Sequence, residues 1–128
     1  MPFEEGLFEY LDNHPGLSRE VDSRIYALKL PQRVELPAVT YQRVSTPRLL
    51  AFQRSFLPHP RFQFKCWAGT FPRARNVAEQ VVAALNIYMG AMGDYTVQVS
   101  IVEDDRDIYE PVTKLYTSLV EVVIWHES

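Results

Sequence analysis

The chain has 128 residues, of which 47% are hydrophobic and 23% are charged. These proportions are typical of a globular protein and exclude a disordered one, and the length predicts a single domain over residues 1–128. The net charge of −3 argues against a dedicated nucleic-acid-binding protein, which normally carries a basic excess. Cys66 is the sole cysteine and cannot form an internal disulfide, so we expect it to be a small buried residue.

The N-terminal part predicts one helix followed by two strands. Helical spacing predicts a helix over residues 3–13, and the proline-containing segment 13–16 should end it. A brief stretch then leads to expected strands over residues 25–28 and 38–45. The acidic N-terminus lacks the basic region of a signal peptide, and the longest apolar run is well short of the ~20 residues of a membrane span, so we expect no membrane association.

Residues 46–60 are the least regular part of the sequence, with three prolines among apolar side chains. Such a connection is typical of an extended hairpin tip or a docking loop, or it folds back over the core. Aromatic residues interleaved with basic ones can also indicate nucleic-acid binding, although the chain is acidic overall. The interleaved side chains, called the loop patch below, are Arg48, Phe52, Arg54 and Phe56.

Residues 61–68 alternate between apolar and polar side chains, which predicts a strand with Phe62, Phe64 and Cys66 facing inward. A helix should follow, with Thr70 as its N-cap and an apolar stripe that includes Tyr88. We expect this helix to reach about residue 89, with Arg75 on its outer side, and to end at the glycines that follow.

The last third predicts two long strands joined by an acidic turn. The first arm alternates through Tyr95, Val97, Val99 and Ile101. The second arm, residues 112–126, is apolar at both odd and even positions, so it must be covered on both faces, either by its own fold or by another subunit.

The acidic turn is the one dense cluster of potential ligands in the sequence. Its carboxylates could bind a divalent cation through oxygen ligands, but the segment lacks the glycine and the alternate spacing of a calcium loop. A solvated turn, or one that pairs with arginines of a neighbouring subunit, is the favoured interpretation. The acidic residues are Glu103, Asp104, Asp105, Asp107 and Glu110.

Other sequence signals of catalysis are missing. The three histidines have no partner at metal-ligand spacing, and the sequence contains no phosphate-binding loop and no nucleophile or paired catalytic motif. We therefore expect a protein that is not an enzyme and has no catalytic residue, metal or cofactor.

Several segments, taken in order, resemble one protein family. The sequence is similar to the tail-completion, or tail-to-head joining, proteins of long-tailed bacteriophages, also called tail terminators. It departs from them in a longer loop over residues 46–60 and in Lys114, where relatives often have glycine. The segments that carry the resemblance are RIYALKLPQ from Arg24, LPAVTYQRVS from Leu36, RFQFKCWA from Arg61 with the helix after it, and EDDRDIYEPVTKLYTSLVEVVIWH from Glu103.

The resemblance implies an α+β fold, a mostly antiparallel sheet with two α-helices packed on one face. It also implies a ring, usually of six subunits, at the head-proximal end of the phage tail. There the ring would stop polymerisation of the tail-tube protein and join the tail to the head connector or stopper, and DNA would pass through its lumen without specific binding. The protein would be made in the host cytoplasm and reside in the virion.

A closed ring requires two different complementary surfaces on each subunit. We expect one to be the hairpin patch, defined as Asp104, Asp105, Arg106, Asp107 and Tyr109. The loop patch would supply the other, to a neighbouring subunit or to the tail tube, because the two patches are opposite in charge.

Two alternatives remain open at this point. Another structural part of the virion, such as a head–tail connector or a tail-tube subunit, would have a similar composition, but a tube subunit would polymerise openly. A small metal- or ligand-binding domain would instead have a deep pocket and a perturbed titratable group.

Overall fold

The computed structural model describes residues 2–45 and 58–127. In chain order the elements are helices α1 (Phe3–Asp12) and α2 (Pro15–Val21), strands β1 (Ile25–Ala27), β2 (Ala38–Ser45) and β3 (Arg61–Ala68), helix α3 (Phe71–Leu85), and strands β4 (Tyr88–Met92), β5 (Tyr95–Glu110) and β6 (Leu115–Glu127).

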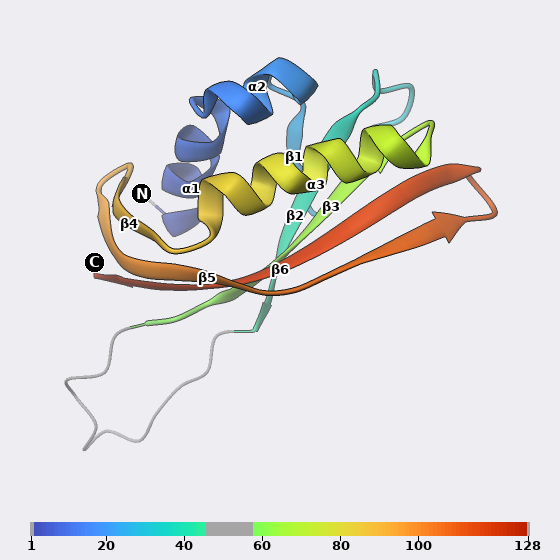
Figure 1. Cartoon of the computed structure of the whole chain (residues 1–128). Helices are drawn as coiled ribbons and strands as arrows, with labels where there is room; N and C mark the ends of the chain where they lie inside the picture. Colours follow the sequence, from blue (N-terminus) through green and yellow to red (C-terminus); the bar gives the residue numbers. More distant parts are fainter. Residues whose placement is uncertain (1, 46–57, 128) are drawn as a thin grey trace.

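All six strands belong to one curled sheet, in the order β1-β2-β3-β6-β5-β4. The β1–β2 pair is parallel and the other neighbouring pairs are antiparallel. The helices lie together on one side of the sheet, with α3 crossing above the central strands (Figure 1). The prediction of an α+β fold with a mostly antiparallel sheet and helices on one face is therefore confirmed.

The number of helices differs from the expectation of two, because α2 follows α1 directly. Pro15 was expected to end a helix, but it also begins the next one, since the first turn of a helix does not need the proline's missing N–H. The His14 ring supplies the cap, because its Nδ1 accepts a hydrogen bond from the Leu17 backbone N–H at 3.4 Å.

The core lies between the helices and the inner face of the sheet. β3 contributes Phe62, Phe64 and Cys66, which are fully buried as their alternation predicts. Burial raises the pKa of the Cys66 thiol to about 12, so the residue stays a protonated, inert part of the core. The other core residues from the main elements are Phe3, Leu7 and Leu11 of α1, Val77, Ala78, Val81 and Leu85 of α3, and Val120, Val122 and Ile124 of β6.

Helix α3 ends earlier than its apolar stripe predicts. It stops at Leu85, and the residues expected to form its last turn form strand β4 instead. The chain reverses at Ile87, whose φ of 56° lies in the left-handed region, and the Ile87 N–H donates to the Ser100 carbonyl of β5 at 2.7 Å. Pairing with β5 thus overrides the helical pattern at Tyr88.

The predicted alternation in β5 also fails beyond Val97. The register against β6 shifts between Val97 and Val99, so that Ser100 points into the core and Ile101 is 39% exposed. The buried Ser100 hydroxyl donates a hydrogen bond to the Leu85 carbonyl at the end of α3. The bulge therefore satisfies a helix C-terminus that would otherwise be buried without a partner.

Helix α1 approaches the sheet closely at Gly6. The residue is buried, and a Cβ placed on it would overlap the Met92 carbonyl oxygen at the end of β4. We expect Gly6→Ala to lower the free energy of unfolding by about 1–3 kcal/mol, because the two backbones must separate. The measurement is chemical denaturation followed by circular dichroism.

Gly69→Ala is the matched control, because a Cβ there meets no atom within 4 Å. It should leave stability nearly unchanged. Equal stability of the two variants would show that α1 and β4 are not in close contact.

Candidate interaction surface

The acidic segment is a strand, which corrects the prediction of a turn. Residues 103–110 are the second half of β5 and pair with β6 from Leu115 to Glu121. The actual turn covers residues 111–114, where Lys114 has a φ of 60°. This left-handed conformation favours glycine, the residue that the resemblance leads us to expect at this position.

The carboxylates of this strand pair with arginines of the same chain. Glu103 contacts Arg61 at 2.6 Å, and Asp104 contacts Arg106 at 3.3 Å. Pairing with arginines of a neighbouring subunit is therefore not needed to balance these charges, although carboxylates remain in excess on this surface. The second half of β5 forms an exposed sheet edge, because β4 pairs only with the first part of β5. Acidic side chains on such an edge hinder pairing with strands of other molecules.

Arg75 of α3 is the central partner of the hairpin patch. Its Nη1 lies 3.1 Å from Asp107 and 3.6 Å from Asp105, and Asp107 also accepts a hydrogen bond from the Ser118 hydroxyl. The Arg75 side chain is 22% exposed, and its buried Nη2 makes no hydrogen bond with any described residue. The helical pattern placed Arg75 on the outer side of α3, which is wrong, because the curl of the sheet brings β5 over it.

The tip of the β5–β6 hairpin exposes apolar and aromatic side chains. Tyr109 is 49% exposed and its ring lies 5.0 Å from that of Tyr116. Ile108 is 42% exposed and Val112 in the turn is 95% exposed. The hairpin patch thus combines charge with apolar area, which suits a protein interface.

The loop patch, Arg48, Phe52, Arg54 and Phe56, lies outside the described residues. Its flanks are anchored near the C-terminal end of β6, where Ile124 and His126 donate N–H groups to the carbonyls of Pro60 and Pro58. The His59 ring also stacks on Trp125, with centroids 4.1 Å apart. The described residues on either side of the loop therefore lie at the opposite end of β6 from the hairpin tip, and the structure does not bring them close to the hairpin patch.

The fold itself covers both faces of β6. The even-numbered residues face the helices, and on the other face Leu119 and Val123 are only 4% and 6% exposed. Their cross-strand neighbours include Arg61 opposite Val123 and Lys65 opposite Leu119, whose long side chains flank the apolar strip. Of the two alternatives for covering this strand, burial by the chain itself therefore accounts for most of its surface.

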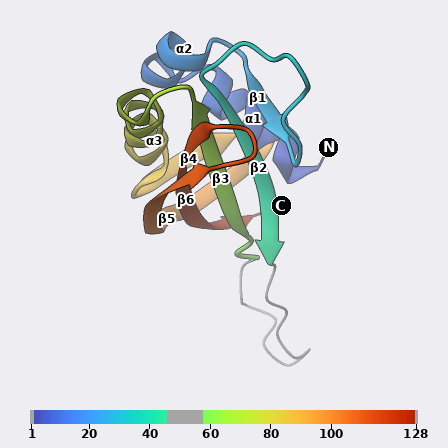
Figure 2. The same cartoon turned by 90° about the vertical axis from the view of Figure 1, so that its right-hand side faces the viewer.

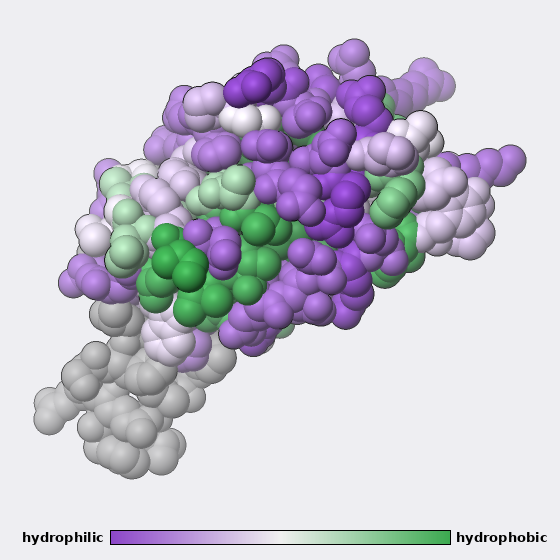
Figure 3. Space-filling model, in the orientation of Figure 1, coloured by the Kyte–Doolittle hydropathy of each residue, from purple (hydrophilic) through white to green (hydrophobic). Residues whose placement is uncertain are grey.

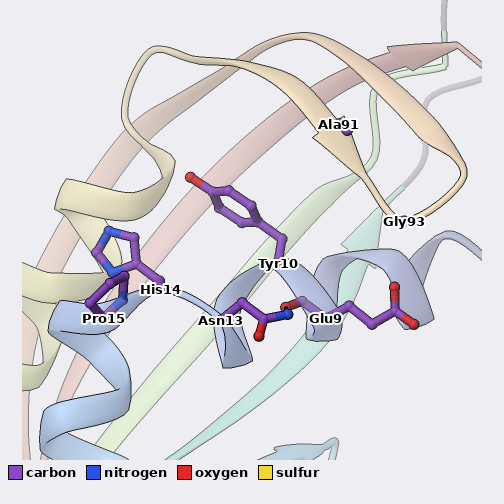
Figure 4. A pocket seen from close by; sticks show the side chains of 7 residues that line it. All are labelled: Glu9, Tyr10, Asn13, His14, Pro15, Ala91 and Gly93. Carbon is purple, nitrogen blue, oxygen red and sulfur yellow. Dashed lines mark hydrogen bonds between the residues drawn. The ribbon is translucent and has the colours of Figure 1, made fainter.

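An open cleft of 420 Å³ lies between the α1–α2 junction and the β4–β5 turn (Figure 4). Tyr10 on its wall donates to the Ala84 carbonyl at 2.6 Å, and burial raises the pKa of Tyr10 to about 12, with a smaller contribution from nearby Tyr88. The Nδ1 atom of His14 is used as the cap of α2. These polar groups support the fold, and their arrangement indicates no reaction.

Two further features concern metal binding and membrane-spanning helices. Within residues 2–45 and 58–127, no group of three or more His, Cys, Asp or Glu side chains is arranged to hold a metal ion. Helices in the same described part of the chain lack the length and apolarity needed to span a membrane.

The contact between Arg75 and β5 can be tested by substitution. We expect Arg75→Ala to reduce the free energy of unfolding by about 1–2 kcal/mol, since it leaves Asp105 and Asp107 to repel each other while partial exposure screens the effect. Denaturation at low and high salt would measure it, and the loss should shrink at high salt. Arg73→Ala, at an exposed position of the same helix, is the control; an equal effect of both substitutions would contradict the assigned role.

Comparison with known proteins places this fold in a family. A search of curated proteins gave no match. Among solved structures, a chain from the "virion of native gene transfer agent (GTA) particle" superposes with a TM-score of 0.75 at 13% identity, covering 95% of this chain and 92% of that chain, which shows a shared fold. The family model described as tail completion protein gp17 matches residues 5–127. Because that match spans nearly the whole sequence, the chain belongs to the tail completion protein gp17 family, whose members are structural tail components of phage-like virions.

Proposed function

We propose that this protein forms a closed ring, of six subunits, at the head-proximal end of a phage-like tail. There it ends polymerisation of the tail tube and joins the tail to the head connector or stopper. The observation that carries the proposal is the family match over residues 5–127, which assigns the chain to tail completion. The fold shared with a chain of a gene transfer agent virion supports it.

The mechanism is recognition, with no bond made or broken. A ring of identical subunits uses a head-to-tail contact, so each subunit offers two different surfaces and closure leaves neither of them free. A closed ring therefore cannot add further subunits in its plane, whereas its two poles can still bind different proteins. This asymmetry lets one ring cap the tail tube and bind the head connector.

The ring would also have to let DNA pass. A lumen rich in carboxylates repels phosphates and prevents specific binding, and the overall charge of −3 agrees with such a lumen. Assembly in the host cytoplasm and final residence in the virion follow from this role.

The hairpin patch is the proposed contact with a neighbouring subunit, and the loop patch is the proposed contact with a neighbour or with the tail tube. The hairpin tip and residues 58–60, which flank the loop, lie at opposite ends of β6. A head-to-tail contact needs two different surfaces on each subunit, and this separation is compatible with that. The exposed Tyr109 ring and the paired charges of Asp104 and Arg106 are the described side chains best placed for such a contact.

The ring can be tested by size-exclusion chromatography with light scattering and negative-stain microscopy of the purified protein. We expect a discrete species of about six subunits with a central hole, because a closed head-to-tail contact fixes the subunit number. Open filaments of variable length would instead support a tail-tube subunit. A monomer at every concentration, with or without added tail tubes, would contradict the ring.

The hairpin patch is tested by Asp104→Lys, which reverses an exposed charge. Reversing Asp105 or Asp107 would also break the Arg75 contact, so neither is a suitable first choice. We expect Asp104→Lys to reduce the ring fraction at least about tenfold at low salt, since like charges at a contact are unfavourable. Asp94→Lys makes the same charge change in the exposed β4–β5 turn and should assemble normally; rings of equal yield from both variants would remove Asp104 from the interface.

A further inference from the structure

Two exposed apolar residues adopt a backbone conformation that is unfavourable for them. Leu28 has a φ of 65° and is 73% exposed, and Ile87 has a φ of 56° and is 63% exposed. Left-handed backbone is rare for residues other than glycine and asparagine, and it is most strained for a β-branched residue such as isoleucine. Each position therefore combines a strained backbone with an apolar side chain exposed to water. Glycine or asparagine at the same position would remove both the strain and the exposed apolar area.

Ile87 belongs to an apolar surface on the β4 side of the sheet. It precedes β4 and lies beside β5, because its N–H donates to the Ser100 carbonyl. Met89, which is 67% exposed, and Ile101 lie next to the Tyr88–Ser100 strand pair, and we call Ile87, Met89 and Ile101 the isoleucine patch. Figure 3 shows apolar surface below the end of α3, with hydrophilic surface to its right along the second half of β5.

Leu28 borders a hollow at the other edge of the sheet. It follows β1, and its N–H donates to the Tyr41 carbonyl of β2 at 2.8 Å. The hollow beside it, called the leucine groove, has a volume of 280 Å³ and mostly apolar walls. An ion pair between Arg43 and Glu4, 2.9 Å long, lies at its rim. The groove is lined by Glu4, Ala27, Leu28, Tyr41, Gln42 and Arg43.

The patch and the groove belong to opposite edges of the sheet. β1 and β4 are the first and last strands of the sheet, and Figure 2 shows β1 at the right and β5, the neighbour of β4, at the left. One surface projects exposed side chains and the other is hollow, so the two differ in shape as the two halves of a head-to-tail contact must.

The charges beside these surfaces are also complementary. Lys29 follows Leu28, and Arg33 lies in the same connection; both are exposed and neither forms an ion pair within the described residues. Beyond Ile101 on β5 comes the acidic stretch from Glu103 to Asp107. A copy that places its leucine groove against the isoleucine patch therefore brings basic residues towards acidic ones.

We propose that the isoleucine patch of one copy inserts into the leucine groove of the next copy, so that the β4–β5 edge of one sheet meets the β1 edge of its neighbour. This inference rests on the proposed ring and identifies its main contact. Ile87 is the inserting side chain, and Leu28 forms the wall that receives it.

The test uses Ile87→Asn and Leu28→Asn in the full-length protein. Asparagine tolerates left-handed backbone, so each variant should unfold at the same temperature as the wild type or a higher one. Each should nevertheless lose ring assembly, with at least a tenfold higher concentration needed for association. Phe71→Asn removes a 44% exposed apolar side chain at the start of α3, outside both surfaces, and should assemble like the wild type.

Mixing the two asparagine variants separates this contact from other arrangements. Each variant keeps one intact surface, so a head-to-tail contact predicts a dimer of one copy of each variant and no larger species by light scattering. Wild-type rings together with intact rings of Ile87→Asn would overturn this inference and leave the proposed function standing. A wild-type protein that never forms rings would overturn both the ring and this contact.

Discussion

The structure depends on a central strand that is paired on both edges and buried on both faces. β6 lies between β3 and β5 over most of its length, and its two sets of side chains must both be kept from water. The helices cover one set, and long side chains of neighbouring strands flank the other. Because the chain meets this requirement largely by itself, the surfaces that we propose for contact with other subunits are at the two edges of the sheet and at the hairpin tip.

The acidic second half of β5 stabilises the fold through its contact with Arg75, and its charge also limits association with other molecules. Arg75 joins α3 to Asp105 and Asp107, so the hairpin is held over the helix while carboxylates line an exposed edge. Charged edges prevent indiscriminate strand pairing, which the proposed ring of fixed size would require. The apolar surface available for a specific contact is thereby restricted to a few residues, such as Ile87 and Ile101 near the bulge.

Recognition of the family depended on ordered segments along the chain, and the match over residues 5–127 confirms it. The residues that we expected at a subunit interface differ in how well the sequence predicted their surroundings. Asp104 and Tyr109 are exposed as an interface requires, whereas Asp105 and Asp107 have an intramolecular partner that no local pattern revealed. In the sequence, only the positive charge of Arg75 indicated that it could pair with the distant acidic segment. Several other arginines have the same charge, so the sequence could not identify Arg75 as the partner.

The sequence by itself determined the fold class, strands β2 and β3, helix α1, the start of α3 and the burial of Cys66. These features follow from side-chain periodicity within a few residues of each other. Tertiary structure decided where α3 ends, the existence of β4, the bulge between Val97 and Val99, and the change of the acidic segment from turn to strand. In each of these places a backbone hydrogen bond or an ion pair to a residue far along the chain outweighs the local preference, as Ile87 pairs with Ser100 and Arg75 with Asp107. Such long-range interactions have no periodic trace in the sequence, so only the folded chain reveals them.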